Sequence, residues 1–400
     1  MKVAEQIRSI YERCPYPTVK SRAPLRLHWR LPPWEWITTV WESSRAYPVK
    51  ILVAGCGTGN EAFAFAGKFP AAQIVAIDYS PRSIAVAKKL QRRSTRFARI
   101  RFRVGDLADR SFARRFEERF DFISCHGVLS YIPQTSRVFA SLAKCLAVDG
   151  ALYVGVNGSA HFSERWRKAL TQFDTATPAH LDRIVALMDA LSGEAIGAVV
   201  EKEPAYLAGD LFAPLIRNLP LTEWIRRARG VRLNFRSSYA SVAALRSVFN
   251  ESREHLLFPR SRAEVARLTE TLRPAAFHQL IFTKKSAPAI PWHGHALLDW
   301  RPVLPPHLKK TRWPQPRGRS PTLRRVKIKR PEMNTQIELR LPEWGLEILR
   351  GGDKKHSVRE LLGRTPPHVP LTRLLQTLYL LHQLCLLNLA PPRRRTRAAQ

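Results

Sequence analysis

The stretch "VKILVAGCGTGNEAF", Val49 to Phe63, places a glycine cluster between a short apolar run and a helical pattern. Gly55, Gly57 and Gly59 follow directly on the apolar run and open the helix. Glycine lets the chain turn tightly there and brings backbone N–H groups close to a ligand at the helix N-terminus. The stretch therefore predicts a strand, a ligand-binding turn and a helix, in that order.

The residues around this stretch alternate short apolar runs with helical patterns, which is typical of a parallel sheet covered by helices. The strand candidates are "VKILVAGC", "QIVAIDY", "IRFRVGDL", "FDFISCHGV" and "GALYVGVN". Between them, "NEAFAFAGKF", "PRSIAVAKKLQRR" and "QTSRVFASLAKCL" carry apolar residues three and four apart, as helices do. Two later strands, "VRLNF" and "FHQLIFTKK", would complete the sheet. The prediction is an α/β fold with a Rossmann-like, doubly wound sheet of seven strands.

Composition limits the class of protein. The chain has 400 residues, of which 45% are hydrophobic, enough for at least one large core and for two or three domains. No apolar run reaches the length of a membrane span, and the first residues lack the apolar core of a signal peptide, so we expect a cytoplasmic protein. The five cysteines are scattered without a CxxC pair, which predicts neither a disulfide framework nor a metal site.

The charge is extreme, with a formal net charge of +34. Such a field attracts nucleic acid, anionic lipid or acidic protein surfaces, but a bias toward arginine on solvated faces gives the same number. Both interpretations stay open. Basic residues are densest between Ser286 and Arg330, where Trp292, Trp300 and Trp313 are interleaved with them. Arginines and tryptophans in that pattern could hold a phosphate backbone and stack bases.

Carboxylates follow the glycine cluster at regular places. Glu61 falls in the opening turn of the helix, where it would repel a pyrophosphate, although "GTGNEA" fits the looser dinucleotide pattern. Asp78 ends the second strand, where it can accept both hydroxyls of a ribose. Asp106 ends the third, where it can accept from the amine of adenine while Leu107 packs on the ring. Together these residues predict a site for an adenosyl group, and S-adenosylmethionine fits it.

These motifs carry a resemblance. "ILVAGCGTGN", "VAIDYSPRSIAVAKK", "IRFRVGDL" and "FDFISCHGVLSYIPQ" resemble the successive motifs of class I S-adenosylmethionine-dependent methyltransferases. "IYERCPYP", "DLFAPLIRNLPLTEWIRRARGVRLNF" and "LRPAAFHQLIFTKK" are similar to bacterial methyltransferases with a methyltransferase regulatory segment, a group that includes rickettsial protein lysine methyltransferases. The resemblance implies a methyltransferase that uses S-adenosylmethionine and methylates a protein side chain, most simply lysine. In one departure, Val53 stands where many class I enzymes have an acid that contacts the amino acid part of the cofactor.

Strand ends supply the other site candidates. His126 and Gly127 end the fourth strand, at the edge where open α/β sheets bind ligands. The expected cofactor-binding residues are Gly55, Gly57, Gly59, Asp78, Tyr79, Asp106, Leu107, His126, Gly127 and Tyr16, the last as part of an N-terminal lid. His126, Tyr131 and Asn157 are the catalytic candidates, with Ser130 beside them, because they could face the acceptor. Each of them also fits a structural or cofactor-contacting role.

Three acceptor or function classes remain beside protein lysine. RNA is the second candidate on charge, small molecules are a third, and a nucleic-acid-binding protein with a vestigial methyltransferase fold is a different class. The fourth strand has no Asn-Pro-Pro-Tyr motif, which disfavours the amines of adenine and cytosine as acceptors. Cys56 and Cys125 fit small buried fillers better than nucleophiles.

The predicted domain organisation has six segments. They are an N-terminal helical lid (1–48), the cofactor-binding methyltransferase core (49–158), a helical insertion (159–229), the last strands of the sheet (230–285), a basic proline-rich linker (286–330) and a C-terminal helical module (331–400). The linker is expected to build no core of its own because proline and charge dominate it.

Overall fold

The computed structural model describes residues 3–17, 32–42, 48–116, 119–170, 187, 190, 209, 213–250, 257–309, 311–313, 324–330, 335–363 and 370–392. The chain divides into two compact units. The first comprises Met1–Leu31, Tyr47–Asn234 and Arg273–Lys284, and the second comprises Pro32–Ala46, Phe235–Leu272 and Lys285–Gln400. Among the described residues, no helix combines the length and the apolar character that crossing a bilayer requires.

Six strands of a seven-stranded sheet lie in the first unit; the strand order is β3-β2-β1-β4-β5-β7-β6, and only the first residue of the edge strand β6 belongs to that unit. The strands are β1 Lys50–Ala54, β2 Gln73–Asp78, β3 Ile100–Val104, β4 Phe120–His126, β5 Leu146–Asn157, β6 Asn234–Ser238 and β7 Phe277–Thr283. The first five run parallel to their neighbours, whereas β7 is antiparallel to β5. The structure thus confirms the predicted Rossmann-like sheet of seven strands and the late strand β7, but β6 begins at Asn234, so the predicted strand "VRLNF" was placed about three residues too early.

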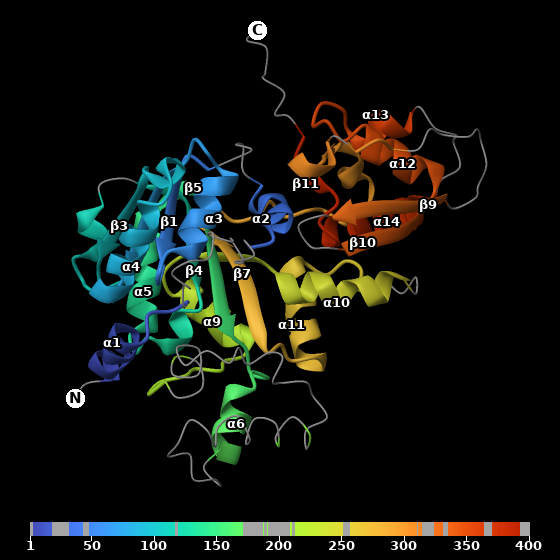
Figure 1. The fold of residues 1–400 in the computed structure, drawn as a ribbon. Helices are drawn as coiled ribbons and strands as arrows, with labels where there is room; N and C mark the ends of the chain where they lie inside the picture. Colours follow the sequence, from blue (N-terminus) through green and yellow to red (C-terminus); the bar gives the residue numbers. More distant parts are fainter. Residues whose placement is uncertain are drawn as a thin grey trace. The chain divides into compact units, whose positions relative to one another are not determined.

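Helices pack along this sheet (Figure 1). α3 Asn60–Lys68, α4 Pro81–Gln91 and α5 Thr135–Cys145 contact its strands, α1 Val3–Arg13 packs on α4 and α9 Leu221–Arg229 on α5, and α6 Ser163–Leu170 extends away from the sheet. The central strands are covered on both faces, which explains their continuous apolar sequence: Ile51, Leu52 and Val53 are completely buried. Most of the expected helical insertion, 159–229, lies outside the described residues, which include only its two ends and a few single positions.

The second unit has a core of its own. Its elements are α2 Trp34–Trp41, α10 Tyr239–Asn250, α11 Arg262–Leu272, β8 Arg301–Val303, β9 Arg324–Arg330, β10 Thr335–Leu341, α12 Glu343–Arg350, α13 Val358–Leu362, α14 Leu371–Gln383 and β11 Asn388–Ala390. β9 pairs with β10 and β8 with β11, both antiparallel. Leucines of α12 and α14 make up much of the core. The predicted C-terminal helical module (331–400) contains α12, α13 and α14, but it also contains the strands β10 and β11, which the prediction missed.

The expected linker differs from the structure. Trp292 and Trp300 are buried in the second unit's core, and the ring centroids of Trp292 and Tyr379 lie 5.1 Å apart. Residues 324–330, which also fell in that segment, form β9, with Val326 and Ile328 buried. The linker prediction rested on the average composition of the segment, in which proline and charge dominate. It therefore missed the few apolar residues, which pack into one core.

The N-terminal lid also differs from its expected extent. Its helix α2 belongs to the second unit, where the Thr39 carbonyl accepts a hydrogen bond from Asn388 Nδ2 at 2.6 Å. Trp36 donates from Nε1 to the Ser237 hydroxyl in the same unit at 3.3 Å. The residues that α2 contacts are far away in sequence, so no local pattern could have assigned this helix to the second unit.

Candidate active site

A cavity of about 320 Å³ lies in the first unit, at the carboxyl ends of the parallel strands. The end of each strand from β1 to β5 contributes to its lining, as expected for an open α/β sheet. Of the predicted cofactor and catalytic residues, the structure brings these to the cavity: Tyr16, Gly55, Gly57, Asp78, Tyr79, Asp106, Leu107, His126, Gly127, Tyr131 and Asn157. Gly59 and Ser130 do not line it.

The glycine turn between β1 and α3 requires glycine for two reasons. Gly55, Gly57 and Gly59 have φ values of 81°, 52° and 95°, which residues with a Cβ rarely adopt. At Gly57 a Cβ would also lie only 2.1 Å from the carbonyl oxygen of Tyr16. The turn therefore allows the N-terminal segment to approach the strand ends closely.

Residues 3–17 close one side of the cavity. The carbonyl of Tyr16 accepts from the Thr58 N–H at 3.1 Å, and the Thr58 hydroxyl donates to the carbonyl of Pro17 at 2.8 Å. Helix α1 contributes Ala4, Ile7 and Tyr11 to the lining. The segment that the sequence predicted as a lid thus holds Tyr16 at the cavity by backbone contacts with the glycine turn.

Asp78 holds the turn in place from the end of β2. Its Oδ2 accepts from the Gly57 N–H at 2.8 Å and its Oδ1 from the Ser80 N–H at 2.9 Å. Burial raises the pKa of Asp78 above its ordinary value, against the opposing effect of these two donors. Each carboxylate oxygen keeps a second lone pair, so Asp78 can still accept from two ligand hydroxyls.

Asp106 and Leu107 form the next part of the wall, after β3. Asp106 is exposed, and its Oδ1 accepts from the Ala108 N–H at 2.8 Å, which fixes the carboxylate at the strand end. Leu107 is buried and offers an apolar surface beside it. Tyr79 follows β2, and the guanidinium of Arg8 lies over its ring at 5.1 Å from the centroid. This end of the cavity suits a flat ring with an exocyclic amine.

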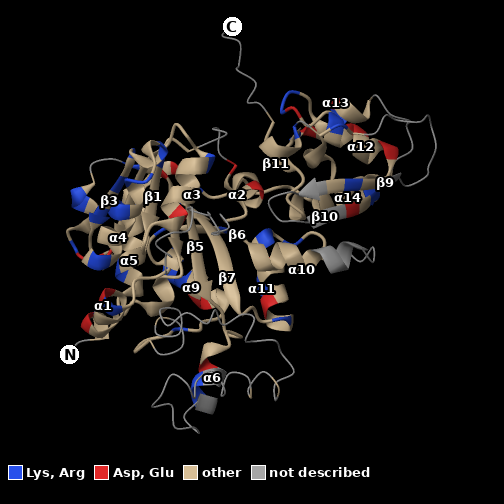
Figure 2. Ribbon diagram, in the orientation of Figure 1, with Lys and Arg blue, Asp and Glu red and all other residues tan. Residues whose placement is uncertain are grey.

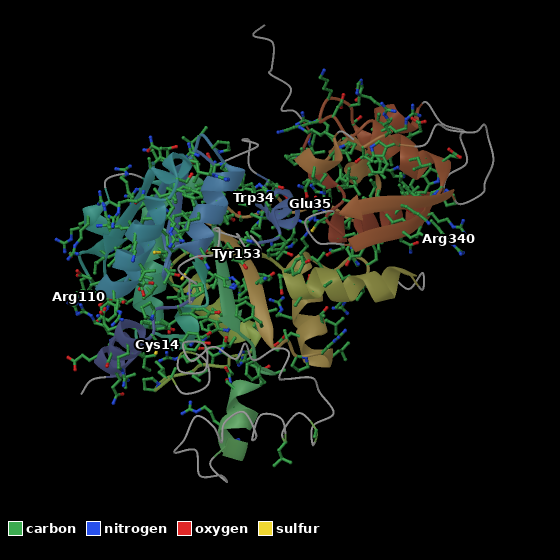
Figure 3. The ribbon with its side chains drawn as sticks, viewed as in Figure 1. Cys14, Trp34, Glu35, Arg110, Tyr153 and Arg340 are labelled. Carbon is green, nitrogen blue, oxygen red and sulfur yellow. The ribbon has the colours of Figure 1, made fainter. Side chains whose placement is uncertain are left out.

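His126 lies at the end of β4 with a neutral imidazole. Its Nδ1 is 2.9 Å from the hydroxyl of Tyr153, a buried residue of β5 (Figure 3). A Cβ at Gly155 would lie 2.4 Å from the same nitrogen, so glycine makes room for the ring. Burial lowers the pKa of His126 to about 4, which leaves it uncharged at neutral pH.

Asn157, at the end of β5, connects the cavity to the last part of the insertion. Its amide Nδ2 donates to the Tyr131 hydroxyl at 3.3 Å and to Asn218 Oδ1 at 3.2 Å. Its backbone carbonyl accepts from Trp224 Nε1 at 3.1 Å. The Ser130 hydroxyl accepts from the Asn157 N–H, so Ser130 fixes the strand end and does not face the cavity.

Several lining residues were not predicted as site residues, and Glu61, His161 and Phe277 are the ones among them that matter for the chemistry. Glu61 was noted only for repelling phosphate, yet its side chain is buried at the cavity. His161 and Phe277 line the end near β5 and β7. Burial lowers the pKa of His161 to about 4, and its Nδ1 lies 2.8 Å from the Ser163 hydroxyl. All three residues lie close to a strand end in the sequence, and that position could have suggested them as site residues.

The cavity contrasts in charge with the rest of the chain. Lys and Arg are frequent on outer elements such as β3 and α4 (Figure 2), where Arg101, Arg103, Lys88 and Lys89 are exposed. The cavity lining, as far as the structure describes it, contains the three carboxylates of Glu61, Asp78 and Asp106 and neither Lys nor Arg. No three His, Cys, Asp or Glu side chains within the described ranges lie together as metal ligands would.

Comparison with known proteins agrees with this geometry. Residues 52–152 match a family described as a methyltransferase domain. An uncharacterized protein of Synechococcus is 32% identical over 160 residues, 38% of this chain and 37% of that protein. The malonyl-[acyl-carrier protein] O-methyltransferase of Bacillus anthracis is 30% identical over 116 residues, 29% of this chain and 40% of that protein. The matches span about two fifths of these relatives.

Among solved structures, PKMT2 from Rickettsia typhi has a similar fold. The TM-score is 0.55 at 16% identity, with 94% of this chain and 78% of that chain covered. The same protein in complex with AdoHcy gives 0.55 at 15% identity, with 90% and 75% covered. The comparisons confirm the predicted class I, S-adenosylmethionine-dependent methyltransferase domain and its likeness to the rickettsial proteins.

Proposed function

We propose that this chain, which carries a class I S-adenosylmethionine-dependent methyltransferase domain, transfers the methyl group to the side-chain amine of a lysine in a protein. The observation that carries this proposal is the charge of the cavity: three carboxylates and, among the described lining residues, neither Lys nor Arg, in a chain of net charge +34. Such a lining favours ligands that bear positive charge.

The cofactor fits this lining. When bound, S-adenosylmethionine supplies a methyl group on a positively charged sulfonium. Asp78 would accept from its ribose hydroxyls and Asp106 from its adenine amine, with Leu107 against the ring. The glycine turn lets the backbone approach the ligand closely. These residues would together hold the cofactor at the carboxyl ends of the strands.

An amine acceptor suits the same lining better than a carboxylate. A carboxylate acceptor placed about 4 Å from an ionised carboxylate of this lining would be repelled by roughly 4 kcal/mol at an effective dielectric constant of about 20. The Bacillus relative is named for transfer to a malonyl group, so its acceptor differs in charge from the one proposed here. A lysine ammonium is attracted instead, and desolvation lowers its pKa toward the neutral form that attacks.

The end of the cavity near β5 has groups that can orient such an acceptor. We assign this role to His126, Tyr131 and Asn157, which line the cavity there, with His161 and Phe277 beside them. The neutral imidazole of His126 does not repel a cation, but its low pKa makes it a weak base. Orientation within about 3 to 3.5 Å of the methyl group is the main requirement of an in-line displacement.

RNA as the acceptor receives less support. That hypothesis rested on charge, and the tryptophans between Ser286 and Arg330 were to stack on bases, but Trp292 and Trp300 are buried and Trp313 packs, partly buried, against the same core. Buried rings cannot stack on bases. Contact of the remaining basic side chains with a polyanion, away from the cavity, stays a proposal.

The test uses methyl-labelled S-adenosylmethionine with the purified chain and a bacterial extract. We expect label that protease removes, ribonuclease leaves and alkali does not release, because alkali cleaves methyl esters but not methylated amines. Acid hydrolysis should then yield methylated lysine. The control is Asp78→Ala, which should reduce the label strongly because it weakens cofactor binding. Label lost to ribonuclease, or released by alkali, would contradict the proposal.

A further inference from the structure

Glu61 is a buried carboxylate without a paired cation among the described residues. Its side chain is 7% exposed, and its Oε1 accepts from the Ser124 hydroxyl at 2.7 Å. Ser124, itself buried in β4, is the one hydrogen-bond partner of that carboxylate in the described part of the chain. A single neutral donor does not compensate the burial of a charge. Accordingly, burial raises the pKa of Glu61 to about 7.

The residues around Glu61 offer no structural reason for a carboxylate. Val53 is the ladder partner of Ser124, so β1 contributes only methyl groups at this level of the sheet. Cys56 and Cys125 are buried nearby, and burial raises both thiol pKa values, with a further contribution from the charges of Asp78 and Glu61 at Cys56 and of Glu61 at Cys125. An apolar residue would pack here at lower cost, which points to a ligand that uses the carboxylate.

The three carboxylates of the cavity follow the order of the strands. The sheet runs β3-β2-β1-β4, with Asp106 after β3, Asp78 at the end of β2 and Glu61 between β1 and β4 through its bond to Ser124. S-adenosylmethionine is a linear molecule of adenine, ribose, sulfonium and amino acid. If Asp106 binds adenine and Asp78 binds ribose, Glu61 falls at the amino acid end.

We infer that the Glu61 carboxylate binds the α-ammonium group of the cofactor's amino acid part, with the Ser124 hydroxyl orienting it. The inference rests on the proposed use of S-adenosylmethionine and adds a binding residue to that site. Glu61 lines the cavity, so its carboxylate can meet a ligand there without rearrangement of the sheet. The ammonium supplies the countercharge that the described residues lack.

The experiment compares two ligands that differ only in the group concerned. S-adenosylhomocysteine carries the amino acid, whereas 5′-methylthioadenosine has the same adenosine and thioether without it. For Glu61→Gln, which keeps an acceptor for Ser124, calorimetry should show S-adenosylhomocysteine binding weakened by about 10- to 100-fold, the range of a hydrogen bond to a charged group. Binding of 5′-methylthioadenosine should stay within about 2-fold, which also shows that the variant is folded.

A matched control separates the outcomes. Asp106→Asn should weaken both ligands alike, because both contain adenine. If Glu61→Gln also weakens both ligands alike, or weakens neither, the assignment of Glu61 is wrong while the proposed cofactor stands. If the unmodified protein binds neither ligand, the proposed cofactor fails and the assignment fails with it.

Discussion

Replacing Glu61 by glutamine should stabilise the ligand-free protein relative to the parent, and this gain in stability should be larger at pH 8 than at pH 5. The pKa of Glu61 rises from an ordinary 4.5 to about 7 in the fold, because burial disfavours the charge. Because its pKa is higher in the folded than in the unfolded state, Glu61 contributes stability that is fully present below pH 4.5, where the acid is neutral in both states. That stability is lost as the pH rises through 7. A shift of about 2.5 units corresponds to roughly 3 kcal/mol when fully expressed.

Between pH 5 and pH 8 the cost of burying the ionised Glu61 should grow by about 2 kcal/mol. Glutamine cannot ionise and keeps an acceptor for the Ser124 hydroxyl. The difference in free energy of unfolding between Glu61→Gln and the parent should therefore increase by that amount over this pH range. All other titrations cancel because both proteins share them.

Denaturant unfolding followed by tryptophan fluorescence at the two pH values measures this difference. Ser124→Ala serves as the companion variant. The Ser124 hydrogen bond lowers the pKa of Glu61, so the free energy of unfolding of Ser124→Ala should depend more steeply on pH than that of the parent. An equal difference between Glu61→Gln and the parent at pH 5 and pH 8 would refute the burial argument. It would also remove one support for Glu61 as a ligand of a cation.

Three further changes test the site. Asp78→Ala should weaken S-adenosylmethionine binding at least 10-fold in calorimetry, because two ligand hydroxyls lose a charged acceptor; unchanged affinity would contradict the assignment. Gly57→Ala meets the Tyr16 carbonyl at 2.1 Å at a φ of 52°, so it should cost about 1–2 kcal/mol or more and speed proteolysis within residues 3–17; an unaltered cleavage rate would argue against the contact. Gly155→Ala should push His126 away from Tyr153 and slow methyl transfer about 10-fold with cofactor affinity within about 2-fold, measured as kcat and Kd; an unchanged kcat would remove His126 from the acceptor end.

The Glu61 and Asp78 predictions concern different parts of one ligand. Loss of the Asp78 carboxylate should weaken the binding of every ligand that contains adenosine. Loss of the Glu61 carboxylate should weaken the binding only of ligands that carry the amino acid. Comparison of the two variants therefore shows which group of the cofactor each carboxylate contacts. That distinction does not depend on the identity of the methyl acceptor.

The sequence alone determined the sheet and the first part of the site. Strands and helices of the first unit have strong local patterns, and the ends of parallel strands must meet at one edge, so Gly57, Asp78 and Asp106 could be placed together without coordinates. His126 and Asn157 followed from the same rule. These residues depend on local backbone geometry and on sheet topology.

Only the tertiary structure decided the second unit and the burial of Glu61. The core that contains Trp292 and Trp300 joins segments from α10 to β11, and the bond between Thr39 and Asn388 spans 349 positions. Composition averages over such a segment and cannot say which side chains meet. Glu61 sits one helical turn from the glycines, but whether its carboxylate faces water or Ser124 depends on how α3 packs on β4. The sequence could not predict these features because they depend on packing between distant elements: whether a side chain is buried is decided by its neighbours in the fold and not by the residue alone.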